Sequence, residues 1–289
     1  MWVIRLVAFD LDGTVLHHSN YPSQVSWDVI RALLERGVVV ASISGRNFDR
    51  NQLPFREDPN VANALYVGGY NGALAFAPHV NGRRELMYEQ RLPADVFDEL
   101  MQYIADRQMN FVYCRCDLEG DDISEVYITD RDTEMGRAVA AMTDMTYEVD
   151  GGLVDRIQRG DLGIPPKVMI LPDTEHLEQT LGDLDRIFGD RIYKAWAVAG
   201  RVEIMHSQVD KSVALKAIAN HAGIPMHEVM ALGDGNNDLP MLNAAGVGVL
   251  MGNADEATKA DVVDMGLHTT LPVDEDGFAA AVRKFVLDV

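Results

Sequence analysis

Asp10 and Asp12, separated by one leucine, follow directly after an apolar run from residue 4 to residue 9. Carboxylates are hard oxygen ligands, and a pair of them suits a divalent cation such as Mg²⁺. Taken alone, the two aspartates could also cap the strand or form a turn. The Gly13–Thr14 pair that follows marks the turn itself. The first motif therefore predicts either a metal-binding strand end or a simple turn.

Three further polar signals occur at comparable places along the chain. They are the segment Ser44–Gly45–Arg46 after an apolar run, Lys211 at the start of a predicted helix, and "GDGNND" from Gly233 to Asp238. In an open α/β sheet, ligands bind beyond the carboxyl ends of the strands. We therefore expect these residues to gather with Asp10 and Asp12 at one edge of a sheet.

The first and last thirds of the chain alternate strand and helix patterns. Apolar runs predict strands buried on both faces at residues 3–9 and 38–44. Further strands are predicted at 64–74, which ends in a glycine-rich turn, and at 228–234 and 247–252. Helical spacing of apolar residues predicts helices at 26–37, 210–223, 237–246 and about 276–287, with Ser26 as the N-cap of the first. Such alternation predicts a doubly wound parallel sheet covered by helices, an α/β fold.

The middle of the chain has a different pattern, with more charge and with paired strands. Segments 110–115 and 124–130 resemble a hairpin, and a helical stretch at 175–189 precedes two strands joined by an Ala–Gly turn at 199–200. This predicts an α+β module inserted into the α/β domain. We place the core at residues 1–82 and 199–289, and the insert at 83–198.

Composition limits the possible partners. The net charge of −20 and the isoelectric point of about 4.6 argue against binding nucleic acid or an anionic membrane. No apolar run reaches the about 18 residues of a membrane span. Cys114 and Cys116 are too close for a disulfide framework, which favours a reducing compartment. We expect a soluble cytoplasmic protein, and its oligomeric state stays open.

In order, "DLDGT", "SISGR", Lys211 and "GDGNND" resemble the four motifs of the haloacid dehalogenase-like phosphatases. The insert between the second and third motifs is similar in position and size to the cap of the Cof-type subfamily. "YNGAL" at 70–74 and "MGNADEATKADVV" at 251–263 also resemble that subfamily. The resemblance implies a core of that fold with an inserted C2-type α+β cap that contacts the substrate.

The same resemblance implies a Mg²⁺-dependent phosphatase acting on a small phosphorylated metabolite, such as a sugar phosphate. It makes Asp10 the nucleophile that forms an aspartyl-phosphate. Asp12 would protonate the leaving alcohol and then activate water. Gly13 would let the backbone approach the phosphate closely.

The remaining roles also come from the resemblance. The phosphate-binding residues would be Ser44, Gly45, Arg46, Lys211 and Asn237. The metal-binding residues would be Asp10, Asp12, Asp234 and Asp238. For Arg46, pairing with a local carboxylate is an equal alternative, and Asp238 could orient Lys211 instead of binding metal. Asn71 is a weaker candidate for supporting the first loop.

Two other functions remain open. A phosphomutase would use the same two aspartates and return the phosphoryl group to a sugar. A non-catalytic protein could bind a phosphorylated ligand at a vestigial site. Release of free phosphate from a monoester distinguishes the phosphatase from both.

Overall fold

The computed structural model describes residues 3–17, 20–119, 122–143, 146–196 and 201–288. The chain forms two compact units, Met1–Glu89 with Asp210–Val289, and Gln90–Val209, which we name the first and second units. The predicted Ala–Gly turn at 199–200 lies outside the described residues. None of the described helices is both long enough and apolar enough to cross a membrane.

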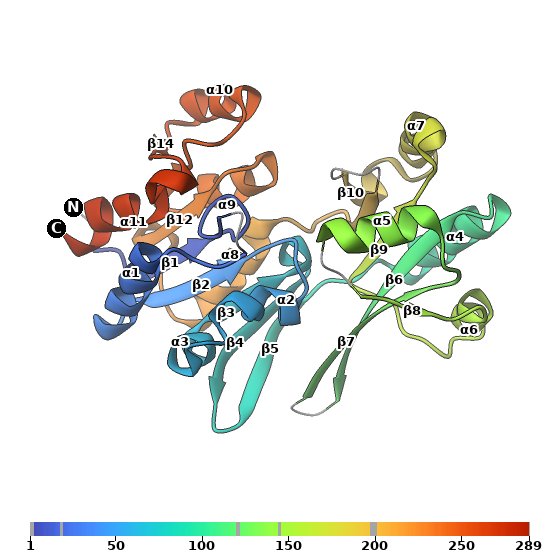
Figure 1. Ribbon diagram of the computed structural model, residues 1–289, viewed down its shortest axis with the longest axis horizontal. Coiled ribbons are helices and arrows are strands. Elements are labelled where there is room, and N and C mark those ends of the chain that lie inside the picture. The colour runs from blue at the N-terminus through green and yellow to red at the C-terminus, as the bar shows by residue number, and fades with distance from the viewer. Residues whose placement is uncertain (1–2, 18–19, 120–121, 144–145, 197–200, 289) are drawn as a thin grey trace. The chain divides into compact units, whose positions relative to one another are not determined.

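The first unit is built on an eight-stranded sheet (Figure 1). In spatial order its strands are β14 (His268–Thr269), β13 (Val247–Leu250), β12 (Val229–Gly233), β1 (Leu6–Phe9), β2 (Val39–Ile43), β3 (Tyr66–Gly69), β4 (Leu74–Val80) and β5 (Arg83–Glu89). The strands from β14 to β3 run parallel, and β4 and β5 add antiparallel. Successive strands move outward from β1 in both directions, so the predicted doubly wound α/β fold is confirmed.

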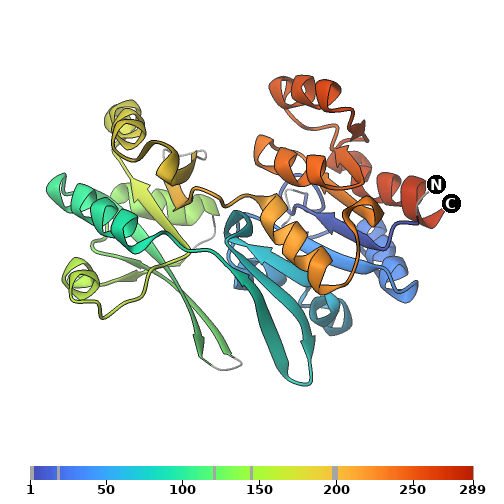
Figure 2. The same ribbon diagram turned by 180° about the vertical axis from the view of Figure 1, so that it is seen from behind.

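Helices cover both faces of this sheet. One face packs against α1 (Gln24–Glu35), α3 (Pro59–Ala64) and α11 (Gly277–Val282). The opposite face packs against α8 (Lys211–His221), α9 (Leu239–Ala244) and α10 (Glu256–Met265), and Figure 2 shows this side. Strand β1 contributes Val7 and Phe9 to one core and Leu6 and Ala8 to the other. Burial on both faces explains why the sequence of β1 is continuously apolar.

Two local predictions were wrong in detail. Helix α1 begins one turn earlier than expected, because the Ser23 hydroxyl accepts a hydrogen bond from the Ser26 amide at 3.1 Å and so caps the helix. The single strand expected at 64–74 is divided into β3 and β4. Tyr70, Asn71 and Gly72 separate them with φ angles of 53°, 55° and 100°, which reverse the chain direction.

Glycine is required at position 72. Besides its positive φ, a Cβ atom there would lie 2.2 Å from the carbonyl oxygen of Asp210. The turn between β3 and β4 therefore packs directly against the start of α8. This contact fixes the backbone from which Lys211 projects.

The Arg84 side chain fastens β5 to the rest of the first unit. Its guanidinium donates to the carbonyl oxygens of Leu65 and Ala77 at 2.9 Å and to that of Ala62 at 3.0 Å. We expect Arg84→Met to lower the thermal midpoint by about 5–10 °C, because three carbonyl oxygens lose their donor at about 1 kcal/mol each. Arg83→Met, on the exposed neighbour, is the control, and equal midpoints for the two variants would contradict this role.

The second unit contains a six-stranded sheet with its own core. The spatial order is β10 (Ile192–Trp196), β11 (Val202–His206), β9 (Lys167–Leu171), β6 (Asn110–Glu119), β7 (Asp122–Thr129) and β8 (Glu148–Val149). One face packs against α4 (Ala94–Asp106), α6 (Leu153–Gln158) and α7 (Leu177–Phe188). Helix α5 (Glu134–Thr143) follows β7. Cys114 and Cys116 are buried, and neither forms a disulfide bond.

The boundaries between the two units differ from the predicted ones, which enclosed an insert at residues 83–198. Residues 83–89 form β5, which pairs with β4 and extends the first sheet. Residues 202–206 form β11, which pairs with β9 and β10 in the second sheet. The divisions consequently fall after Glu89 and after Val209. The hydrogen bonds between neighbouring strands determine which unit a strand belongs to. The change in composition along the chain does not reveal these hydrogen bonds.

Candidate active site

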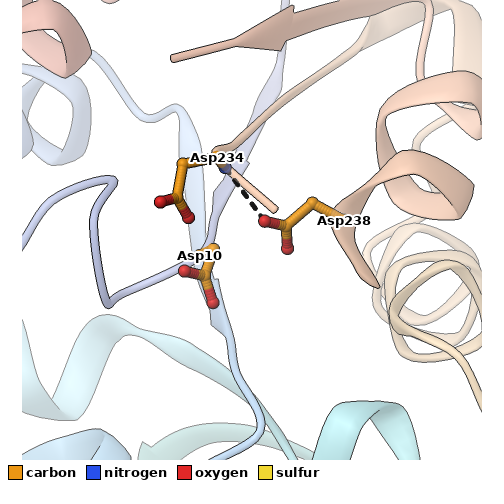
Figure 3. A group of neighbouring side chains, drawn as sticks. All are labelled: Asp10, Asp234 and Asp238. Carbon is orange, nitrogen blue, oxygen red and sulfur yellow. Dashed lines mark hydrogen bonds between the residues drawn. The ribbon is translucent and has the colours of Figure 1, made fainter. Parts of the chain in front are cut away.

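Three carboxylates meet where β1 and β12 end. Asp10 follows β1, Asp234 follows β12, and Asp238 ends the short turn that precedes α9 (Figure 3). One oxygen of each carboxylate lies within 4.8 Å of the others. Strands β1 and β12 are neighbours at the point from which the sheet winds in both directions, which is where open α/β sheets bind ligands.

Lys211 lies against this carboxylate group. Its side chain is 1% exposed, and Nζ lies 2.5 Å from Asp10 Oδ1 and 2.5 Å from Asp238 Oδ1. Asp210 caps α8 by accepting from the Ser212 amide at 2.7 Å, so the lysine is the first residue of the helix. The cap and the packed turn at Gly72 together direct the ammonium group at Asp10.

Asp238 uses both oxygens to hold its neighbours. Oδ1 accepts from Lys211, and Oδ2 accepts from the backbone amides of Asp234 and Gly235 at 2.9 Å each. At Gly233 a Cβ atom would lie 2.4 Å from the Asp238 side chain, so only glycine allows this approach. Of the two roles predicted for Asp238, these contacts favour the one that orients Lys211, and that role stays a prediction.

The three carboxylates carry more negative charge than Lys211 neutralises. Burial raises the pKa of Asp10 well above its usual range, because Lys211 only partly offsets it and Asp238 and Asp234 add repulsion. Burial, with repulsion from Asp238, raises the pKa of Asp234 to about 7. Burial alone would lower the pKa of Lys211, but Asp10 and Asp238 outweigh it and raise that pKa, so the lysine stays charged.

This charge balance and this donor set suit a divalent metal ion. The ligands available are carboxylate oxygens, which Mg²⁺ prefers, and a second cation would offset the repulsion that raises both aspartate pKa values. Asp10 and Asp234 are the candidate ligands within this group, since Asp238 already contacts Lys211 and two amides. Asp12 was predicted to bind the metal as well, but among the described residues its carboxylate is not part of the group that could hold an ion.

The raised pKa values predict pH-dependent metal binding. With Asp234 as a ligand, Mg²⁺ would have to displace a proton below about pH 7, so we expect the apparent dissociation constant to rise about tenfold per pH unit there. Above pH 8 it should level off. Isothermal titration calorimetry between pH 5.5 and pH 8.5 measures it. Asp234→Asn should weaken binding and flatten the profile, whereas equal affinity at pH 5.5 and pH 8.5 would refute the prediction.

The Asp12 side chain pairs with Arg46 instead. Arg46 Nε donates to Asp12 Oδ2 at 2.8 Å, and Nη2 donates to Asp12 Oδ1. Nη2 also donates to Asn20 Oδ1 at 3.0 Å. The guanidinium is turned toward a local carboxylate, which was one of the two alternatives for this residue.

The other predicted residues are linked to each other through Asn71. Ser44 is buried, its carbonyl oxygen accepts from the Asn71 amide at 3.0 Å, and its hydroxyl accepts from the Arg46 amide at 3.2 Å. A Cβ atom on Gly45 would lie 3.1 Å from Asn71 Oδ1. Asn237 Nδ2 donates to that same Oδ1 at 3.4 Å. Asn71 therefore joins the loops after β2 and β12.

Asn253 contacts the site but was not among the predicted site residues. Its Nδ2 donates to the carbonyl oxygen of Gly13 at 2.9 Å and to Asp234 Oδ2 at 3.1 Å, while Oδ1 accepts from the Val273 amide at 2.8 Å. At Gly13, whose φ is 78°, a Cβ atom would lie 2.1 Å from Asp234 Oδ2. The close approach that this glycine permits is thus to Asp234. The signal available in the sequence was the "MGNADEA" segment directly after an apolar strand.

Comparison with known proteins gives a consistent result over nearly the whole chain. A model of the haloacid dehalogenase-like hydrolase family matches residues 7–282. The chain is 28% identical over 285 residues to the 5-amino-6-(5-phospho-D-ribitylamino)uracil phosphatase YitU of Bacillus subtilis, covering 97% of each chain. It is 25% identical over 267 residues to the HMP-PP phosphatase of Shigella flexneri serotype 5b, covering 89% of this chain and 88% of that one.

Solved structures share the fold. The structure of TM0651 from Thermotoga maritima matches with a TM-score of 0.82 at 23% identity, covering 98% of this chain and 97% of that one. Because the match covers nearly the full length of both chains, both units have counterparts in that protein.

Proposed function

Because the chain belongs to the haloacid dehalogenase-like hydrolase family, we propose that it is a Mg²⁺-dependent phosphatase that hydrolyses small phosphate monoesters through an aspartyl-phosphate. One observation carries this proposal. Asp10, at the end of β1, contacts the buried Lys211 at 2.5 Å and lies in the same group of carboxylates as Asp234 and Asp238. A nucleophile, a fixed cation and metal ligands are the parts that phosphoryl transfer needs.

In the first step, an Asp10 carboxylate oxygen attacks phosphorus and the bond from phosphorus to the ester oxygen breaks. Lys211 limits the repulsion between the carboxylate and the phosphoryl oxygens, because its charge is fixed within hydrogen-bonding distance of Asp10. Held by Asp10 and Asp234, Mg²⁺ would supply further neutralisation of the phosphoryl charge. Asp12 gives a proton to the departing oxygen.

In the second step, Asp12 takes a proton from water, which attacks the phosphorus of the aspartyl-phosphate. The bond between phosphorus and Asp10 then breaks, and its electron pair returns to the Asp10 carboxylate. Asp12 suits both proton transfers because its side chain is 60% exposed, while Asp10 is buried. Ser44, the Gly45 amide and Asn237 are the proposed contacts to the phosphoryl oxygens.

We assign selection of the leaving group to the second unit, as the cap. The proposed substrates are small phosphorylated metabolites, among which sugar phosphates are one class. Relatives named as phosphatases of a ribitylamino-uracil phosphate and of HMP-PP support this class. A reducing compartment such as the cytoplasm belongs to the same proposal, which is supported by the absence of a disulfide bond at the buried Cys114 and Cys116.

A panel of sugar phosphates, nucleotides and cofactor phosphates, with Mg²⁺ or with EDTA, tests the proposed function. We expect Mg²⁺-dependent release of inorganic phosphate from at least one monoester. Transfer of the phosphoryl group to another position of a sugar, without free phosphate, would indicate a phosphomutase. Binding of a phosphorylated compound with no turnover across the panel would indicate a binding protein.

A further inference from the structure

Arg46 shares its hydrogen bonds unequally between the two oxygens of Asp12. Nε donates to Asp12 Oδ2 at 2.8 Å, while Nη2 donates both to Asp12 Oδ1 and to Asn20 Oδ1. Both Asp12 oxygens therefore accept from the guanidinium, an arrangement of two hydrogen bonds that fixes the orientation of a carboxylate. The structure thus holds the Asp12 side chain in one orientation.

Asn20 gives the guanidinium a second acceptor. Nη2 donates to Asn20 Oδ1 at 3.0 Å, so Arg46 has a contact outside Asp12 that holds its own position. The guanidinium can therefore act as a fixed support for the Asp12 carboxylate.

We propose that Arg46 is the positioning residue for Asp12, because its guanidinium fixes the orientation of the carboxylate. This inference rests on the proposed function, since it needs Asp12 to act as acid and base. When phosphorus transfers to Asp10, the electron pair of the broken ester bond goes to the leaving oxygen, which receives a proton from Asp12. When water attacks the aspartyl-phosphate, Asp12 takes the water's proton and the electron pair of the broken bond returns to Asp10.

The surroundings of the pair fit a positioning role. The Arg46 side chain is 12% exposed and that of Asp12 is 60% exposed, so the anchor is fixed in the protein and the carboxylate faces solvent. The Arg46 backbone is held as well, because its amide donates to Ser44 Oγ at 3.2 Å and its carbonyl oxygen accepts from the Tyr70 amide at 2.9 Å. An exposed ion pair adds little stability, but two parallel hydrogen bonds fix geometry.

The dependence of the rate on the leaving group separates this role from phosphate binding. Nitrophenolate departs from p-nitrophenyl phosphate without a proton, whereas the alkoxide of glycerol phosphate needs one. The ratio kcat/KM reports only the steps up to formation of the aspartyl-phosphate. For Arg46→Met we expect kcat/KM to fall about 100-fold on glycerol phosphate and about fivefold or less on p-nitrophenyl phosphate.

Two further variants test whether geometry or charge matters. Arg46→Lys keeps the charge but cannot contact both Oδ2 and Asn20, so we expect the same selective loss on glycerol phosphate. In an Asp12→Asn background, Arg46→Met should add little, since the acid is already gone. Arg5→Met, which breaks the exposed pair with Glu228 at 2.9 Å, is the matched control for removing an arginine.

Several outcomes overturn the inference. Equal losses on both esters, together with weaker inhibition by inorganic phosphate, would make Arg46 a phosphate ligand. Full activity of Arg46→Lys on glycerol phosphate would mean that charge alone suffices. A thermal midpoint of Arg46→Met far below that of Arg5→Met would make the loss structural. If the wild type hydrolyses neither ester with Mg²⁺ but binds phosphate, the proposed function fails and Arg46 is not the cause.

Discussion

Asp10→Asn is expected to reduce phosphatase turnover by roughly four orders of magnitude or more, since an amide oxygen cannot act as the nucleophile. The fold should survive the substitution. Asparagine has the same shape, and Lys211 keeps its contact with Asp238 at 2.5 Å. The free energy of unfolding should even rise slightly above pH 7, because the substitution removes one charge from a group whose pKa values burial raises.

The measurement is single-turnover phosphate release with Mg²⁺, together with acid quenching to look for phosphate bound covalently to the protein. The wild type should show a covalent adduct that maps to Asp10, and Asp10→Asn should show none. Asp28→Asn, an exposed aspartate of α1, is the control and should retain full activity. An active Asp10→Asn enzyme would remove Asp10 as the nucleophile.

Lys211→Met should have the second-largest effect, and it should act on stability as well as on activity. It leaves the buried Asp10 and Asp238 without the cation that lies 2.5 Å from each of them. Breaking a buried ion pair by removing one partner costs about 3–5 kcal/mol. Lys216→Met, on an exposed residue of the same helix, removes the same charge from solvent and should cost little.

The pH dependence of Lys211→Met follows from the sign of the shifts. The pKa of Lys211 is raised, so its stabilising charge is present throughout the range below pH 10. In the variant, Asp10 and Asp234 bind protons more readily, so the loss of stability should be largest at pH 8 and smaller at pH 5. Thermal midpoints at both pH values, with and without Mg²⁺, measure it. A loss that grows toward pH 5 would contradict this account.

The sequence was sufficient to predict the family and the fold class, and both predictions are confirmed. Asp10, Asp234 and Lys211 could be chosen because each occupies a place that the fold fixes. Two follow central parallel strands, and the third begins a helix. Where the backbone element determines the position of a side chain, spacing along the chain is enough to predict it. Their catalytic roles stay predictions.

The directions in which side chains point could not be predicted from the sequence. Nothing in "SISGR" tells whether Arg46 turns toward a phosphate or toward Asp12, because both lie beyond the same strand end. Asn253 was missed because its contacts with Gly13 and Asp234 depend on the packing of distant loops. The left-handed conformation of Tyr70 was missed too, since the Asn71–Gly72 pair marks a turn in the sequence but a tyrosine at positive φ is uncommon.

The interruption of the first unit by the second has a consequence for the order of folding. Strands β1 and β12 pair directly, with Leu6 opposite Val229, yet all of Gln90–Val209 lies between them in the chain. Closing that gap costs less entropy when the intervening chain is already compact than when it is a long flexible loop. Early collapse of the second unit should therefore speed the pairing of β1 with β12. A substitution that weakens its core, at Phe111 for example, would delay the meeting of Asp10 with Asp234.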